Sequence, residues 1–175
     1  DGATVDVIQL IPTHATIRPW VDPAVDARGH DPRGAYVERF WLSVIGPTAT
    51  WIMRRFADEF DREPDGFTLD LHHAARSMGL SFAKGQNSPF GKALHRCVMF
   101  GLAQPASDGF AVRRRFPTVA QRHLRRLPDD LRATHDEWAR RMVRPDRGDL
   151  ERRLVEAGVP AVAVARAYEA VALAS

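Results

Sequence analysis

The feature that most constrains the fold of this chain is the stretch 66–117, where signals for a strand, two capped helices and a hairpin follow one another. Phe67 and Leu69 alternate with polar residues, which is typical of a short, half-buried strand. Asp70 comes next, and its carboxylate can accept hydrogen bonds from the free backbone N–H groups at the start of a helix. Gly79 stands where that helix would end, because glycine readily adopts the left-handed conformation that closes a helix.

A second helix is predicted over 88–101. Ser88 is a favourable N-cap, and Pro89 suits the first helical position, where no backbone N–H needs a partner. The following segment, 102–116, contains an Asp-Gly dipeptide, which is a strong short-range signal for a β-hairpin turn. The predicted order is therefore strand, helix, turn, helix and hairpin.

This order resembles the winged form of the helix-turn-helix superfamily. The resemblance rests on the segment DLHHAARSMGL, on the capped helix after it, and on the Asp-Gly hairpin that ends in three arginines. It implies that the second helix enters the major groove of DNA and that the hairpin, or wing, contacts the DNA backbone. Winged helices also serve as protein-docking modules, since a fold does not fix a function. Two further segments, AYVERFWLSVIGPTATWIMRRFADEF and SPFGKALHRCVMFGLA, are similar to uncharacterised hypothetical proteins of GC-rich bacteria.

The fold is expected to be mainly α, of the α+β class, with three parts. Residues 1–34 carry a strand signal around 5–10 followed by repeated prolines, and we interpret them as an extended N-terminal arm with Trp20 as an anchor. Residues 35–143 are interpreted as the winged helix-turn-helix domain with flanking helices. The aromatic residues of 36–60 are expected to supply most of its core, and an exposed aromatic face used for dimerisation is the alternative. Residues 149–175 are predicted to form a helical hairpin. Its second helix is apolar almost all round, so we expect the domain or a second copy of the chain to cover it.

Three residues of the second helix are the candidates for reading bases. Phe90 and Leu94 belong to its apolar side, and Lys92, His95 and Arg96 fall on the opposite side. Arg96 can donate two hydrogen bonds to N7 and O6 of a guanine. An ordinary solvated helix face is the alternative interpretation.

Two groups of residues that flank this helix are candidates for phosphate contacts. Lys84, Asn87 and Ser88 precede it and carry groups that commonly hold a phosphate at a helix N-terminus. Arg113 and Arg115 alternate with apolar residues of the hairpin and are expected to face outward, where a wing contacts DNA. The alternatives are a plain polar loop and a charged strand that discourages edge pairing.

The composition excludes several classes of protein. The chain has 25 basic and 22 acidic residues, a net charge of +3, and a single cysteine. One cysteine excludes an internal disulfide and a Cys-based zinc site, and together with the absence of a signal peptide it favours the cytoplasm. No apolar run approaches the ~20 residues needed to span a bilayer. No HExxH, glycine-rich nucleotide loop or GxSxG motif occurs, so we expect no catalytic residue, no metal ligand, no cofactor and no enzyme activity.

We therefore expect a cytoplasmic, bacterial DNA-binding protein, a transcriptional regulator that reads duplex DNA with the helix 88–101 and the wing 102–116. One alternative is a winged-helix protein-interaction module attached to the transcription or replication machinery. The other is an RNA- or ribosome-associated protein. A homodimer formed through 149–175 is a further hypothesis.

Overall fold

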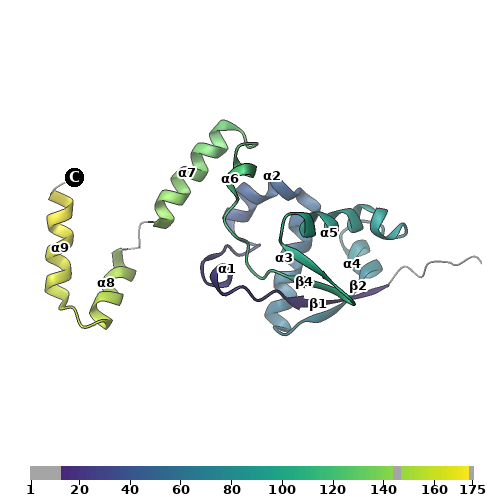
Figure 1. Cartoon of the computed structure of the whole chain (residues 1–175), viewed down its shortest axis with the longest axis horizontal. Coiled ribbons are helices and arrows are strands. Elements are labelled where there is room, and N and C mark those ends of the chain that lie inside the picture. Colours follow the sequence, from purple (N-terminus) through teal and green to yellow (C-terminus); the bar gives the residue numbers. More distant parts are fainter. Residues whose placement is uncertain (1–12, 144–146, 174–175) are drawn as a thin grey trace, which may run out of the picture. The chain divides into compact units, whose positions relative to one another are not determined.

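The computed structural model describes residues 13–143 and 147–173. The described chain has the expected α+β character, with many helices and a four-stranded sheet (Figure 1). It divides into two compact units, one that ends at Leu127 and one that begins at Pro128. The helix α7 (Asp129–Val143) belongs to the second unit, so the boundary between the two units falls inside the predicted range 35–143.

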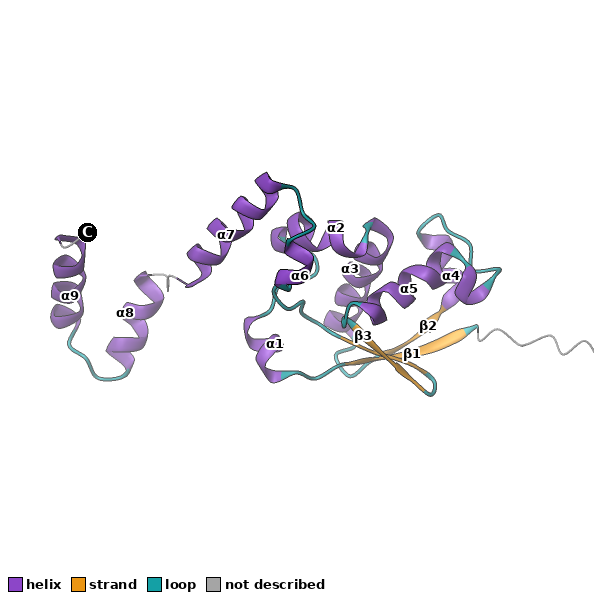
Figure 2. Cartoon of the chain, turned by 45° about the horizontal axis from the view of Figure 1, so that its top comes forward, coloured by secondary structure: helices purple, strands orange, loops and turns teal. Residues whose placement is uncertain are grey.

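The sheet has the strand order β2-β1-β4-β3. Its strands are drawn in orange in Figure 2. The strands are β1 (His14–Pro19), β2 (Phe67–Asp70), β3 (Ala103–Ala106) and β4 (Gly109–Val112). β1 pairs antiparallel with β2 and parallel with β4. β3 and β4 form the predicted hairpin, which is shorter than 102–116 because β4 ends at Val112.

The extended N-terminal arm predicted over 1–34 is wrong for the described part of that range. β1 lies inside the sheet, and a short helix, α1 (Pro23–Arg28), follows it. Ala15 and Ile17 are buried, with exposed fractions of 6% and 0%, and they alternate with polar residues as a half-buried strand requires. The prolines limit the length of this strand but do not prevent it from pairing. The strand predicted around 5–10 lies outside the described residues.

Helices α3, α4 and α5 lie on one side of the sheet (Figures 1 and 2). The helices and helical turns of the first unit after α1 are η1 (Val37–Trp41), α2 (Leu42–Ile45), α3 (Pro47–Arg62), α4 (Leu71–Ser77), η2 (Gly85–Asn87), α5 (Pro89–Met99) and α6 (Gln121–Leu124). The predicted caps are confirmed. The Asp70 carboxylate accepts a hydrogen bond of 2.9 Å from the backbone N–H of His73. Gly79 closes α4 with a φ of +72°.

The core of the first unit lies between the sheet and these helices. Phe67 of β2 contacts Phe56 and Phe60 of α3, with ring centroids 5.8 and 5.3 Å apart. Phe90 and Phe116 are buried, at 1% and 0% exposure. The Phe90 ring packs edge-on against Phe82, and the Phe116 ring packs edge-on against Trp41. The aromatic residues predicted to supply the core are largely buried, and the exception is Trp51 on α3, with 53% of its surface exposed.

In the second unit, α8 (Arg147–Glu156) and α9 (Ala161–Leu173) form the predicted helical hairpin. Gly158 lies between them with a φ of +88°, in the left-handed region that suits glycine.

The turn before α5 packs directly against the first turn of that helix. A Cβ atom added at Gly91 would lie 2.4 Å from the carbonyl oxygen of Gly85 and 2.7 Å from the Cα atom of Gln86. Both distances are too short for non-bonded atoms, so only glycine fits here. This close approach fixes where α5 begins.

Gly91→Ala is expected to destabilise the fold, although alanine is the better helix former by about 1 kcal/mol. The added methyl group meets backbone atoms that cannot rotate away, so we expect a net loss of about 1–3 kcal/mol in the free energy of unfolding, measured by denaturant titration. Lys92→Ala, at the adjacent exposed position, is the control and should change stability by less than about 0.5 kcal/mol. A Gly91→Ala variant more stable than the natural chain would contradict the packing described.

Candidate nucleic-acid interface

The exposed side of α5 carries the three residues that the sequence predicts for base reading. Phe90 and Leu94 are 1% and 7% exposed, whereas Lys92, His95 and Arg96 all lie on the surface. No ion pair joins any of these three side chains to a carboxylate of the described residues. The predicted orientation of α5 is therefore confirmed, and its outer face presents basic groups that salt bridges do not neutralise.

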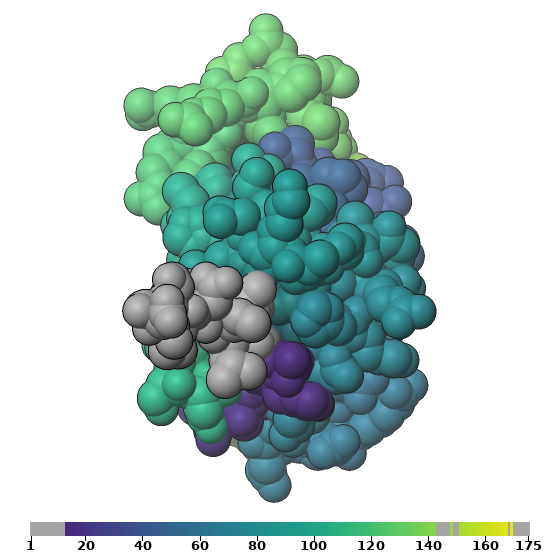
Figure 3. All heavy atoms as spheres, turned by 90° about the vertical axis from the view of Figure 1, so that its right-hand side faces the viewer, coloured from purple at the N-terminus to yellow at the C-terminus, as the bar shows by residue number. Residues whose placement is uncertain are grey.

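This face borders a groove at the start of α3. The groove has a volume of about 390 Å³ and is lined by Gly46, Pro47 and Thr48 on one side and by the basic residues of α5 on the other. The guanidinium of Arg96 lies over Gly46, where its Nη1 atom is 3.3 Å from the position a Cβ would take. In Figure 3, atoms near residues 80–100, coloured teal, form much of the surface on the side that faces the viewer. Lys92, His95 and Arg96 are exposed along this groove.

Charge is distributed unevenly along the chain. The segment 71–127 contains ten arginines and lysines and only one acidic residue, Asp108, which gives it a charge of +9. The rest of the chain therefore carries −6. The modest net charge hides a strongly basic segment that includes α4, α5, the hairpin and α6, and such a segment attracts polyanions.

The loop before α5 matches the predicted phosphate site only in part. Lys84 and Asn87 are exposed and free to approach a ligand. Ser88 is 2% exposed, and its hydroxyl donates to the Gly85 carbonyl at 2.5 Å and accepts from the Gly91 N–H at 3.1 Å. Ser88 therefore caps α5, and its assignment as a nucleic-acid ligand is wrong because both sides of the hydroxyl are used inside the fold.

The predicted phosphate contact by Arg113 is also wrong. Its side chain is 13% exposed and donates to the Asp22 carboxylate at 2.8 Å and to the Gly101 carbonyl at 2.8 Å. Its guanidinium lies 3.8 Å from the centre of the Trp20 ring. β4 ends at Val112, so the alternation of the strand does not decide where Arg113 points. Arg113 instead ties the end of the hairpin to the segment after β1.

Arg115 remains on the surface, where its guanidinium donates to the Gly29 carbonyl at 3.1 Å. At the tip of the hairpin, Arg18 of β1 makes two hydrogen bonds of 2.8 Å to the carboxylate of Asp108. These bonds from Arg18 lower the pKa of Asp108 to about 2. The carboxylate at the hairpin tip is therefore paired with an arginine of β1. The tip offers no unpaired cation to DNA.

The roles of Arg18 and Asp22 are not indicated by the sequence. Their partners lie 90 and 91 residues away along the chain. No local pattern indicates such pairs. Only the insertion of β1 next to β4 brings them together.

The described residues contain no group of three or more His, Cys, Asp or Glu side chains arranged to hold a metal ion. Burial raises the pKa of the Cys97 thiol to about 12, so this cysteine is a packing residue and a poor nucleophile. None of the described helices is both long and apolar enough to cross a membrane.

Comparison of this chain with protein-family models, curated proteins and solved structures found no match. Its function is therefore inferred from its own residues.

Arg113→Ala is expected to lower stability rather than affinity for DNA. The variant loses the contact with Trp20, worth about 1–2 kcal/mol when shielded from water, and leaves the Asp22 carboxylate without its partner. Thermal unfolding measures the loss, and Arg62→Ala, an exposed arginine on α3, is the matched control. If Arg113→Ala unfolds at the same temperature as the control, the tie between hairpin and β1 is dispensable.

The pH dependence of the stability of Asp22→Asn tests the same ion pair between Arg113 and Asp22. Hydrogen bonding from Arg113 holds the pKa of Asp22 below its ordinary value. A carboxyl with a lowered folded-state pKa stabilises the fold above its unfolded pKa, and that contribution is lost as the pH falls through the folded value. The gap in melting temperature between the natural chain and Asp22→Asn should therefore be largest near neutral pH and shrink in acid. An equal gap at both pH values would show that the ionised carboxylate adds nothing.

Proposed function

We propose that this chain binds duplex DNA through the exposed face of α5, as a bacterial transcriptional regulator. The observation that carries the proposal is the set Lys92, His95 and Arg96, which is exposed and without a carboxylate partner in the described residues, on a helix whose other side is buried.

The geometry of α5 fits a major groove. Its 11 residues correspond to about 16 Å of helix, and the major groove of B-DNA is about 12 Å wide and admits an α-helix. Lys92, His95 and Arg96 stand at i, i+3 and i+4, so one orientation of the helix directs all three to the same side. Lys84 and Asn87, exposed just before the helix, are suited to fix it on a phosphate.

The order of elements supports the winged-helix interpretation of this face. β2, α4, α5 and the β3–β4 hairpin follow one another in the order on which the resemblance was drawn from the sequence. Two features are specific to this chain. The segment between α4 and α5, 78–88, is longer than the usual turn of about 3–4 residues, and β1 is inserted between β2 and β4.

A protein-docking function is the second candidate, and two exposed apolar residues favour it. Met99 at the end of α5 is 69% exposed, and Trp51 on α3 is 53% exposed. Met99 also lines the groove between the two helices. A docked protein would use these apolar side chains, whereas DNA would use the basic ones.

Arg96→Ala is expected to relax sequence preference while sparing most nonspecific binding. A bidentate contact from arginine to guanine is worth about 1–3 kcal/mol against a wrong base. Affinity is measured for a duplex selected from a random pool and for random duplex DNA, on the natural chain, on Arg96→Ala and on Arg62→Ala as the control. A similar loss of affinity for the selected and the random duplex would show that Arg96 contacts the DNA backbone and not a base.

The same titration distinguishes the alternatives. Tighter binding to structured RNA than to duplex DNA at equal salt would favour an RNA-associated protein. No binding to either nucleic acid would leave the docking candidate, whose test is the loss of partner binding in Trp51→Ala and Met99→Ala.

A further inference from the structure

A second basic cluster follows the hairpin, on α6 and the turn after it. Arg122, Arg125 and Arg126 are exposed, whereas Leu124 and Leu127 are 4% and 7% exposed. The three arginines stand at i, i+3 and i+4, the same spacing as the basic residues of α5. Backbone hydrogen bonds continue the helical turn from α6 to Leu127, so the spacing describes one face. No salt bridge to a described carboxylate neutralises these side chains.

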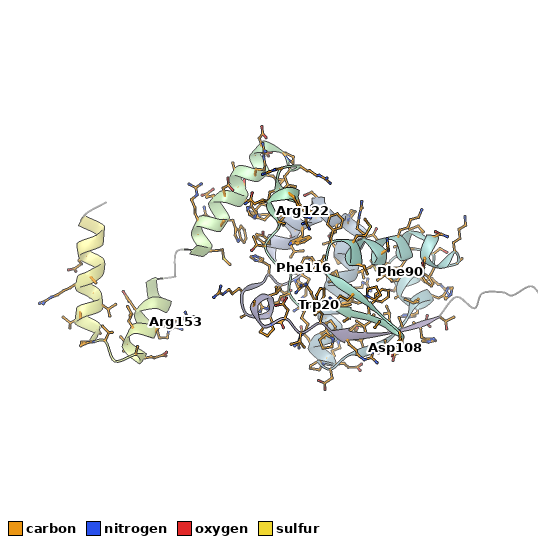
Figure 4. All side chains as sticks on the ribbon, in the orientation of Figure 1. Trp20, Phe90, Asp108, Phe116, Arg122 and Arg153 are labelled. Atoms are coloured by element: carbon orange, nitrogen blue, oxygen red, sulfur yellow. The ribbon has the colours of Figure 1, made fainter. Side chains whose placement is uncertain are left out.

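The position of α6 in the first unit is set by contacts of the segment that leads into it. The indole of Trp41 donates to the Pro117 carbonyl at 2.8 Å, and its ring packs edge-on against Phe116 at 5.4 Å. The backbone N–H of Val119 donates to the Tyr36 hydroxyl at 2.9 Å. These contacts attach the chain before α6 to η1, so α6 is part of the packed unit and not a loose extension (Figure 4).

The end of α5 and the start of α6 are in contact. Phe100 follows the last residue of α5, and its ring lies 5.1 Å from that of His123 on α6. Phe100 is four residues beyond Arg96, so both lie on the same side of α5. His123 in turn accepts a hydrogen bond of 3.2 Å from the Nε of Arg122. The basic side of α5 therefore adjoins α6 through the Phe100–His123 contact.

The electrostatic environment of His123 agrees with this arrangement. Its pKa is lowered, first by burial and then by the positive charges of Arg122 and Arg126. Two guanidinium groups that repel a third positive charge form a site that gains from an anion.

The hairpin does not supply comparable cations. Arg113 is bound to Asp22 and Trp20, and Arg18 is bound to Asp108. Within the described part of the first unit, the exposed arginines that follow α5 and have no carboxylate partner are Arg115, near the hairpin, and the three arginines of α6 and the turn after it.

We propose that the face formed by Arg122, Arg125 and Arg126 binds the phosphodiester backbone of the duplex whose major groove α5 occupies, and so takes the role that the hairpin has in the winged-helix resemblance. The inference rests on the proposed function, because α5 must bring the duplex to this surface. Arginine suits the role, since its guanidinium donates two parallel hydrogen bonds to a phosphate. The contact carries no base information, so it adds affinity for every sequence.

The test is the salt dependence of binding to a random-sequence DNA duplex, followed by fluorescence anisotropy. Each phosphate contact contributes about 0.9 to the slope of log affinity against log salt concentration. The triple variant Arg122→Ala, Arg125→Ala, Arg126→Ala should lower the slope by about 2–3 and weaken binding to all sequences equally. The control is the triple variant Arg28→Ala, Arg55→Ala, Arg62→Ala, which removes the same charge from exposed positions on α1 and α3 and should keep the slope.

Two further arms keep the outcomes distinct. The triple lysine variant at 122, 125 and 126 keeps the positive charge, so it should retain most of the salt slope. The melting temperature of each variant is measured to show that the variant is folded. A double variant, Lys92→Ala and Arg96→Ala, tests the α5 face separately. If this double variant binds DNA more weakly while the triple alanine variant at 122, 125 and 126 has the same salt slope as the control, the inference about these arginines is wrong and the proposed function stands. If the natural chain binds no duplex at low salt, both are wrong.

Discussion

The burial of one side of α5 is the constraint on which the rest of the structure depends. Phe90, Leu94 and Cys97 are each no more than 7% exposed, so the helix cannot rotate without moving apolar surface into water. The start of the helix is fixed independently, because Gly91 lies against the backbone of the preceding turn and Ser88 caps it. A helix held in this way presents one fixed face to solvent, and here that face is basic.

Two sets of arginines in the first unit have different physical roles. Arg113, Arg18 and Arg33 are bound to carboxylates, and Arg33 alone contacts Asp31, Asp58 and Asp61. These pairs attach the segments around β1 and α1 to the hairpin and to α3. The arginine of α5 and the three arginines of α6 and the turn after it have no such carboxylate in the described residues. A chain that pairs some arginines inside its fold and leaves these basic side chains exposed has a surface suited to an external polyanion.

The parts of the fold that depend on neighbouring residues follow from the sequence. The caps at Asp70 and Ser88, the closing glycine at 79, the orientation of α5 and the Asp-Gly turn are all short-range features, and each is confirmed. The insertion of β1 between β2 and β4 is a long-range pairing, and the prolines around it conceal its short alternation of buried and exposed residues. That insertion also explains the error at Arg113, because Asp22 and Trp20 reach it only once β1 lies beside β4. Ser88 caps α5 as the sequence predicts. The same contact removes it from the candidate site, because a hydroxyl that caps a helix is not available to a phosphate.

The most direct test of the central claim is a map of backbone amide chemical shifts of the full chain during titration with a duplex DNA. The account predicts that the largest changes occur along α5, at Lys84 and Asn87 before it, and on α6, and that the acidic end of α3 around Asp58 and Asp61 is unaffected. Chemical-shift changes centred on Trp51 and the rest of the α3 surface, with no change along α5, would contradict the claim that the basic face of α5 is the functional surface of this protein.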